Sequence, residues 1–72
     1  MEKDLSINKV KGYRLMAGIT QEEMAKELNI STVSYRLKES GEREFTRSEM
    51  VAFVNKIKTF DSNATLDLIF LN

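Results

Sequence analysis

The sequence predicts an all-α protein, a compact bundle of five short helices. Apolar residues recur every three or four positions. Glycine, asparagine or capping residues separate these stretches, and the 72 residues contain no proline. A chain of this length buries only about 60–65% of its unfolded surface, so two domains would each lack a core. We therefore expect a single domain over residues 1–72.

The first helix is expected from about Ile7 to Ala17. Val10, Arg14 and Ala17 recur there at helical spacing. Gly18 follows at once, in the position where a left-handed glycine commonly ends a helix.

A capping box predicts the start of the second helix at Gln21. The Thr20 hydroxyl can accept a free backbone N–H while Glu23, three residues on, reaches back to Thr20. Asn29 stands where a left-handed residue would end this helix. One face of the helix is apolar and consists of Met24, Ala25 and Leu28.

Ser31 is a good N-cap for a third helix, which should run to about Glu39 or Ser40 and close at Gly41. Two short helices joined by a turn of three or four residues describe a helix-turn-helix, here over residues 20–39. Its turn needs a positive φ, which asparagine tolerates, and the crossing of its helices needs a small residue, which Ala25 supplies.

A second capping box, Thr46 with Glu49, predicts a fourth helix that ends near Thr59. Its apolar residues are Met50, Val51, Phe53, Val54 and Ile57, with Phe60 beyond the end. Ser62 or Asn63 is expected to cap a last short helix. That helix has apolar residues at positions i, i+3 and i+4, namely Leu66, Ile69 and Phe70.

The segment RLMAGITQEEMAKELNIS resembles the phage-repressor, or Cro/C1-type, helix-turn-helix family. The resemblance covers residues 10–41, and its most specific features are Thr20 with Gln21, Ala25, and the Gly41 that follows Glu39. It implies a lambda-repressor-like DNA-binding domain and a small phage-encoded or phage-derived transcriptional regulator, with repression as its effect.

The third helix departs from the family pattern. Lys38 stands where the family usually buries an apolar residue, and Leu37 stands where it usually shows a polar one. Two registers are therefore open: the family register buries Tyr35, whereas a rotated one buries Ile30, Val33 and Leu37 and turns Tyr35 and Lys38 outward. The count of residues along the helix favours the family register.

In the family, the second helix of the motif enters the major groove, so the resemblance assigns this role to residues 32–39. Arg36 can donate two hydrogen bonds to a guanine, and Val33 or Thr32 can meet a thymine methyl group. Helix N-termini favour phosphate, which suits Gln21 and Ser31. The full set of expected DNA contacts is Gln21, Ser31, Thr32, Val33, Ser34, Arg36, Lys38 and Arg43.

Other noteworthy residues have structural interpretations. Arg14 and Glu39 resemble the family's internal ion pair between the first and third helices, and Tyr35 is expected in the core. Three carboxylates of the second helix are expected to form a solvated acidic face, since no pattern suggests the cleft that acid–base catalysis needs; they are Glu22, Glu23 and Glu27.

Composition excludes most other functions. The chain has no cysteine and no histidine, so the usual metal ligands and general bases are missing. We expect neither an enzyme nor a cofactor, metal or small-molecule substrate. The sequence has no run of about 18 apolar residues that could span a membrane, and its acidic start is not a secretory signal. A cytoplasmic location is therefore expected.

A net charge of zero counts against nucleic-acid binding. Basic residues are nevertheless concentrated in the first twenty positions and acidic ones in the next ten, so a neutral chain can still present a basic face. The alternative function is a protein–protein interaction module with little DNA affinity, which the apolar Val33 and Leu37 would permit.

The expected partner is double-stranded DNA with a near-palindromic operator, read by a homodimer. The C-terminal segment has more apolar residues than one face of a short helix can bury, so two packings are open. These apolar residues either contact a second copy of the chain or close the core of the monomer. They are Leu66, Leu68, Ile69, Phe70 and Leu71.

Overall fold

The computed structural model describes residues 8–71, and all of their regular structure is helical. In chain order the elements are α1 (Lys9–Met16), α2 (Gln21–Leu28), α3 (Thr32–Glu39), α4 (Arg47–Lys58) and a final π-helical turn, η2 (Asp67–Leu71). Residues 8–71 contain no strand. The prediction of an all-α chain with five short helices is therefore confirmed.

Hydroxyl caps begin α2, α3 and α4, as predicted. Thr20 Oγ1 accepts the Glu23 N–H at 3.0 Å, and Glu23 Oε1 accepts the Thr20 N–H at 2.9 Å. Thr46 and Glu49 form the same reciprocal pair before α4, and the Ser31 hydroxyl caps α3. Each cap satisfies backbone N–H groups that have no partner within the helix.

The turn between α2 and α3 depends on a left-handed residue. Asn29 has φ 63° and ψ 42°, as predicted, and its N–H donates to the Lys26 carbonyl at 3.1 Å. Gly18, after α1, and Gly41, after α3, have φ values of 73° and 90°. Glycine, which lacks a Cβ, and asparagine tolerate this left-handed conformation, so the chain can turn immediately after each helix.

The start of α1 differs from the predicted one. Asn8 is the N-cap, and its Oδ1 accepts the Lys11 N–H at 3.0 Å, so the helix begins at Lys9. The predicted start at Ile7 lies outside the described residues. Asparagine is among the best capping residues, and that signal at position 8 was overlooked.

The predicted cap of the last helix is wrong. Thr65 Oγ1 accepts the Leu68 N–H at 3.2 Å and so caps this turn, whereas the Asn63 N–H donates to Asp61 Oδ1 at 3.0 Å. Ser62 and Asn63 belong to the turn that precedes Thr65. Several hydroxyl and amide residues follow one another here, and the sequence does not indicate which of them lies next to the helix.

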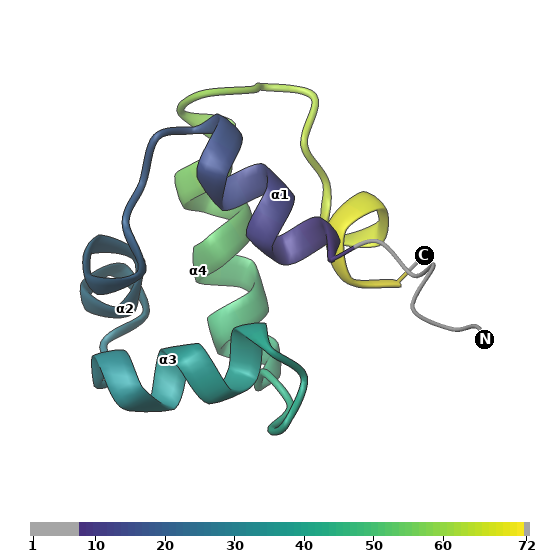
Figure 1. Cartoon of the computed structure of the whole chain (residues 1–72). Coiled ribbons are helices and arrows are strands. Elements are labelled where there is room, and N and C mark those ends of the chain that lie inside the picture. Colours follow the sequence, from purple (N-terminus) through teal and green to yellow (C-terminus); the bar gives the residue numbers. More distant parts are fainter. Residues whose placement is uncertain (1–7, 72) are drawn as a thin grey trace, which may run out of the picture.

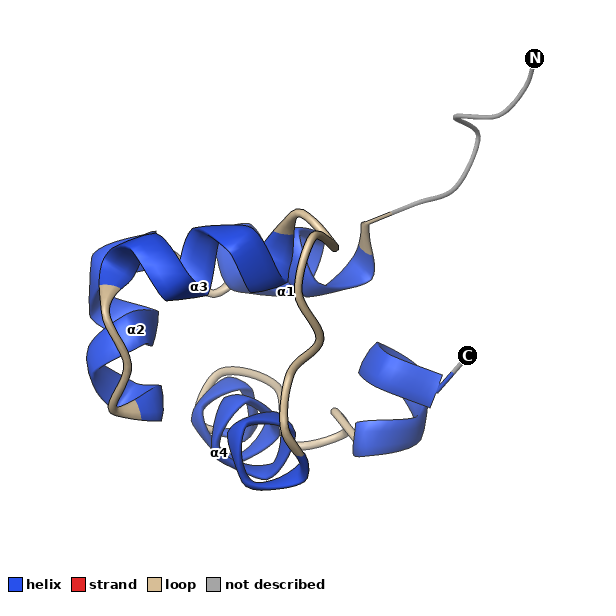
Figure 2. Ribbon diagram, turned by 90° about the horizontal axis from the view of Figure 1, so that it is seen from below, coloured by secondary structure: helices blue, strands red, loops and turns tan. Residues whose placement is uncertain are grey.

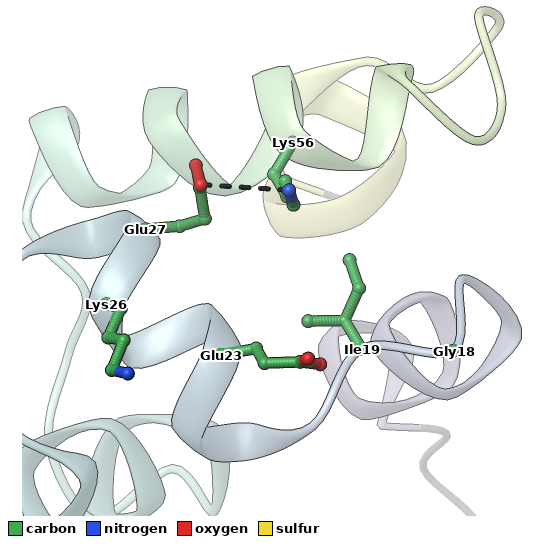
Figure 3. A pocket seen from close by; sticks show the side chains of 6 residues that line it. All are labelled: Gly18, Ile19, Glu23, Lys26, Glu27 and Lys56. Atoms are coloured by element: carbon green, nitrogen blue, oxygen red, sulfur yellow. Dashed lines mark ion pairs between the residues drawn. The ribbon is translucent and has the colours of Figure 1, made fainter.

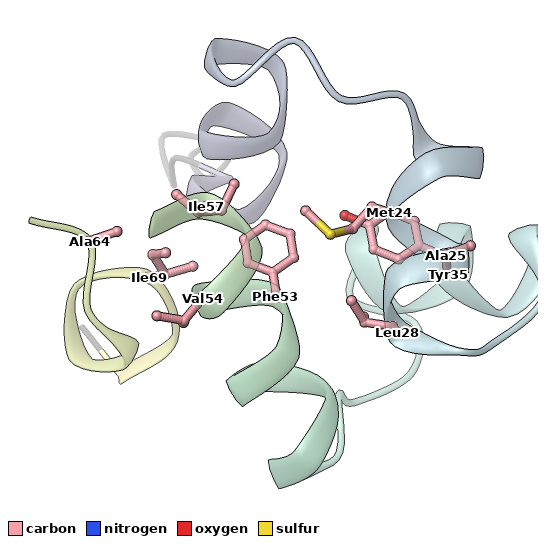
Figure 4. Packing of buried hydrophobic residues seen from close by; sticks show 9 residues of the cluster. All are labelled: Met24, Ala25, Leu28, Tyr35, Phe53, Val54, Ile57, Ala64 and Ile69. Atoms are coloured by element: carbon pink, nitrogen blue, oxygen red, sulfur yellow. The ribbon is translucent and has the colours of Figure 1, made fainter. Parts of the chain in front are cut away.

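Nine buried apolar side chains, counted among the described residues, form one core cluster (Figure 4). The largest of them are less than 2% exposed: Tyr35, Phe53, Met24 and Ile57. Phe53 of α4 lies in the middle, between α2 and α3 on one side and the C-terminal segment on the other (Figure 4). The core therefore depends on α4.

The other helices are arranged around α4, with α2 and α3 joined by their short turn on one side and η2 on the other (Figure 1). Seen from below, α4 and η2 lie on the opposite side of the molecule from α3 (Figure 2). α2 contacts α3 and α4, and α1 contacts η2. Within residues 8–71, no helix has the length and apolar character needed to cross a bilayer.

The left-handed turn gives a first prediction. We expect Asn29→Ala to lower the free energy of unfolding by about 1 kcal/mol, because a Cβ without a local hydrogen-bonding group disfavours this backbone conformation. Asn29→Gly should leave the free energy of unfolding unchanged or raise it. Urea unfolding followed by circular dichroism measures both changes.

Asn55→Ala, at an exposed position within α4, is the matched control. It should not destabilise the protein, since alanine favours a helix. Equal losses of unfolding free energy for Asn29→Ala and Asn29→Gly would show that the positive φ of this residue is not the cause.

Candidate nucleic-acid interface

α3 has a buried side and a solvent-exposed side. Tyr35 is 0% exposed and Val33 is 59% exposed. With 3.6 residues per turn, Val33 and Leu37 lie on the side of the helix away from Tyr35. The family register is therefore confirmed, and the rotated register that turns Tyr35 outward is wrong.

The buried side of α3 ends in a carboxylate with four hydrogen bonds. Glu39 Oε2 accepts from Arg14 Nε at 2.7 Å and from the Tyr35 hydroxyl at 2.7 Å. Glu39 Oε1 accepts from Arg14 Nη2 at 3.1 Å and from Gln21 Nε2 at 3.0 Å. The predicted Arg14–Glu39 pair is confirmed, and its side chains are only 7% and 3% exposed.

Two further bonds extend this network to the chain on either side of α1. Arg14 Nη1 donates to the Ile19 carbonyl at 2.8 Å, in the connection to α2. Asn8 Nδ2 donates to the Glu39 backbone carbonyl at 3.0 Å, so the start of α1 is bound to the end of α3. The sequence analysis missed this bond; the capping signal before α1 could have indicated Asn8 as the N-cap but not its partner 31 positions away.

The network fixes the charge state of its members. Burial alone would raise the pKa of Glu39, but hydrogen bonds from Arg14, Tyr35 and Gln21 outweigh burial and hold that pKa below its ordinary value. The bond to Glu39 raises the pKa of Arg14. Burial, and then the same carboxylate, raises the pKa of Tyr35. At neutral pH the carboxylate is charged and the phenol neutral.

The solvent-exposed side of α3 carries several of the residues expected to contact DNA. Val33 and Arg36 are exposed, Thr32 and Ser34 are half-buried, and Ser31 is exposed at the helix start. Within residues 8–71, the Arg36 side chain makes no hydrogen bond or ion pair. This guanidinium is the charged group of α3 that is open to a ligand.

Arg43 lies in the connection between α3 and α4. Its backbone N–H donates to the Leu37 carbonyl at 3.1 Å, which places Arg43 beside the end of α3. Its side chain is exposed and has no hydrogen bond or ion pair with the described residues. Arg36 and Arg43 are thus two open cations near the same end of the helix.

Two other expected contacts have internal partners. Gln21 donates one amide N–H to Glu39, which leaves a second amide hydrogen for another acceptor. Lys38 Nζ lies 2.5 Å from Glu49 Oε1, and both side chains are only 12% exposed. Lys38 would have to break this ion pair to reach a phosphate.

A hollow of about 430 Å³ opens between α2, α4 and the α1–α2 connection (Figure 3), which the sequence did not predict. Its lining residues are Gly18, Ile19, Glu23, Lys26, Glu27 and Lys56. Lys56 pairs with Glu27 at 3.7 Å. Hydrogen bonds with Thr20 hold the pKa of Glu23 below its ordinary value, the opposite of what a general acid needs.

The carboxylates of α2 are exposed, as expected for a solvated acidic face. Among residues 8–71, no group of three or more potential ligand side chains could hold a metal ion. The hollow therefore offers a mixed-charge surface on the side of α2 that faces α4.

Residues 10–59 match the family model described as helix-turn-helix. The matched range runs from the first turn of α1 to the residue that follows α4 and so includes the whole α2–turn–α3 unit. Neither the curated proteins nor the solved structures contained a match to this chain.

The lowered pKa of Glu39 predicts a loss of stability in acid. A carboxyl group with a lower pKa in the folded state contributes stability above its unfolded pKa of about 4.5, and this contribution is lost as the pH falls through the folded pKa. We expect Glu39→Gln to lower the free energy of unfolding at pH 7 by roughly 3–5 kcal/mol, because Arg14 loses its buried partner. The variant should also depend less on pH between 7 and 3.

Urea unfolding at several pH values measures this effect. Glu22→Gln, at an exposed carboxylate of α2, should follow the pH dependence of the unmodified protein. Parallel pH curves for Glu39→Gln and the unmodified protein would show that Glu39 is not the responsible group.

Proposed function

Because this chain belongs to the Cro/C1-type helix-turn-helix family of DNA-binding regulators, we propose that it recognises specific sequences in double-stranded DNA with α3 in the major groove. The observation that carries this proposal is the exposed side of α3. Arg36 is open there, with apolar Val33 about one turn before it, and the buried Glu39 network fixes the rotation of the helix.

The residues that would read the bases differ in the base groups that they can contact. Arg36 can donate two parallel hydrogen bonds to O6 and N7 of a guanine. Val33 can pack against a thymine methyl group, and so can the methyl of Thr32. The Ser34 hydroxyl can donate to or accept from a neighbouring base edge.

Phosphate contacts would come from the rim of this surface. Ser31 begins α3, where free N–H groups and the helix dipole favour an anion. Gln21 begins α2 and has an amide hydrogen to spare. Arg43 adds a cation beside the end of α3. These contacts would set the position of the protein on the duplex without reading its sequence.

The charge distribution is compatible with DNA binding at zero net charge. Three exposed arginines lie on α3, in its connection to α4 and at the start of α4, namely Arg36, Arg43 and Arg47, and the connection also carries the exposed Glu42 and Glu44. Arg14, counted among the basic residues of the first segment, is buried against Glu39 and does not contribute. We therefore expect few phosphate contacts, about three, and a moderate dependence of binding on salt.

A homodimer that reads a near-palindromic operator is part of the proposal. Of the apolar C-terminal residues, Ile69 closes the monomer core, whereas Leu68 and Leu71 are 44% and 65% exposed. A second copy could cover these two side chains, so that two copies of α3 meet successive half-sites. Occlusion of the operator would then repress transcription.

The phage-derived origin implied by the resemblance and a cytoplasmic location also belong to this proposal.

The alternative is a protein–protein module. Val33 favours it, since this apolar side chain is exposed in the first turn of α3. Binding to DNA decides between the two.

Salt titration tests DNA binding itself. We expect fluorescence anisotropy to detect binding to a random-sequence duplex at low salt, with a slope of about −3 in a plot of log affinity against log salt concentration, because each phosphate contact releases counterions. Absence of binding at low salt would favour the protein–protein module.

Selection of bound duplexes from a random pool would give the operator for a test of Arg36. On that operator, Arg36→Ala should cost about 1–3 kcal/mol and relax the preference at one base pair. Arg36→Lys should keep the salt slope but lose much of that preference, since lysine cannot form the bidentate pair.

Lys58→Ala is the matched control, because it removes one exposed cation at the far end of α4. It should leave affinity nearly unchanged. An equal loss for Arg36→Ala on every sequence would reassign Arg36 to a phosphate.

A further inference from the structure

Lys38 and Glu49 form an ion pair at the junction of α3 and α4. Lys38, the penultimate residue of α3, donates from Nζ to Glu49 Oε1 at 2.5 Å. The same oxygen accepts the Thr46 N–H at 2.9 Å as part of the α4 capping box. One carboxylate oxygen therefore binds the end of α3 and the start of α4 together.

Burial distinguishes this pair from an ordinary surface pair. The side chains of Lys38 and Glu49 are 12% exposed, whereas those of Lys56 and Glu27 are 35% and 45% exposed and lie 3.7 Å apart. Water and salt screen exposed pairs strongly and buried ones much less. The Lys38–Glu49 pair is thus the one of the two that can hold a fixed geometry.

The segment between these residues is also held from within. The backbone N–H groups of Glu42 and Arg43 both donate to the Leu37 carbonyl, at 2.9 and 3.1 Å. The ring of Phe45 packs edge-on against Tyr35, with ring centroids 6.0 Å apart. Arg43 therefore projects from a connection that is fixed at both ends and at its turn.

We propose that the Lys38–Glu49 pair positions the α3–α4 connection so that Arg43 meets the DNA backbone. Lys38 is then a positioning residue that acts through Arg43, in place of the direct phosphate contact expected from its position in the sequence. This inference rests on the proposed function.

The Glu49 carboxylate is a charged partner for Lys38. Burial alone would raise the pKa of Glu49, but the bonds from Lys38 and Thr46 outweigh it and keep that pKa below its ordinary value, so the carboxylate is charged at neutral pH. Without Lys38 this mostly buried charge would keep only its bond from Thr46, and the end of α3 would no longer be bound to the start of α4.

A double-mutant cycle on the selected operator tests the inference. We expect Lys38→Met, which keeps an unbranched side chain one atom shorter but removes the ammonium group, and Arg43→Ala each to weaken binding about fivefold. The double variant should bind as well as Arg43→Ala alone, because a positioning residue has nothing left to position. Equal effects of Lys38→Met with and without Arg43 would overturn the inference.

Glu49→Gln separates positioning from direct contact. If Lys38 acts through the pair, Glu49→Gln should weaken binding in the same direction as Lys38→Met. If Lys38 contacts phosphate itself, loss of Glu49 would free its ammonium group, and unchanged or tighter binding would overturn the inference. Arg36→Ala is the matched background, in which Lys38→Met should keep its full effect.

Two further readouts exclude simpler explanations. Circular dichroism and urea unfolding should show that all variants are folded under binding conditions; a loss of binding that the folded fraction alone accounts for would overturn the inference. Absence of DNA binding by the unmodified protein would refute the proposed function and the inference with it. If the unmodified protein binds DNA but the effects of Lys38→Met and Arg43→Ala are additive, the inference is refuted and the proposed function is not.

Discussion

The carboxylate of Glu39 accepts hydrogen bonds from Arg14, Gln21 and Tyr35 and so joins α1, α2 and α3 at one point. A buried charge is costly unless its hydrogen-bonding capacity is satisfied, and here both oxygens have two donors each. Such a network adds less to stability than to geometry, since only one arrangement of the three helices satisfies it. The rotation of α3, and with it the set of side chains that face outward, follows from this constraint.

Apolar packing and the polar network hold different parts of the molecule. Phe53 on α4 joins α2 and α3 to the C-terminal segment through the core. The only buried residue of α1 is Arg14, and the helix otherwise packs against the core through half-buried side chains such as Val10 and Tyr13. The attachment of α1 therefore depends on hydrogen bonds to Glu39 more than that of α4 does. A small core can tolerate this because one satisfied polar site fixes the position of a helix that contributes little apolar area.

Features set by neighbouring residues could be predicted from the sequence, whereas a feature set by distant residues could be predicted only where the family resemblance supplied it, as for the Arg14–Glu39 pair. The left-handed Asn29 and the capping boxes depend on spacings of a few residues, and the buried Tyr35 follows from the register of one helix. The Lys38–Glu49 pair joins residues eleven positions apart. A lysine near the end of a helix fits a phosphate contact and an internal pair equally well, and the fold decides between them. Asn8 was missed for a related reason, since its bond to Glu39 spans 31 positions.

Net charge is a poor guide to the field that a DNA phosphate would meet at α3. The pairs Arg14–Glu39 and Lys38–Glu49 are mostly buried, so two of the basic and two of the acidic residues contribute little to the surface. Of the charges that remain, the exposed arginines lie on α3, in its connection to α4 and at the start of α4, exposed glutamates lie on α2, and Glu42 and Glu44 are exposed beside Arg43. Under the proposed function, a surface with so few cations gains little affinity from phosphates alone. Recognition would then depend on base edges, which makes the fixed rotation of α3, and hence the buried Glu39, decisive for specificity.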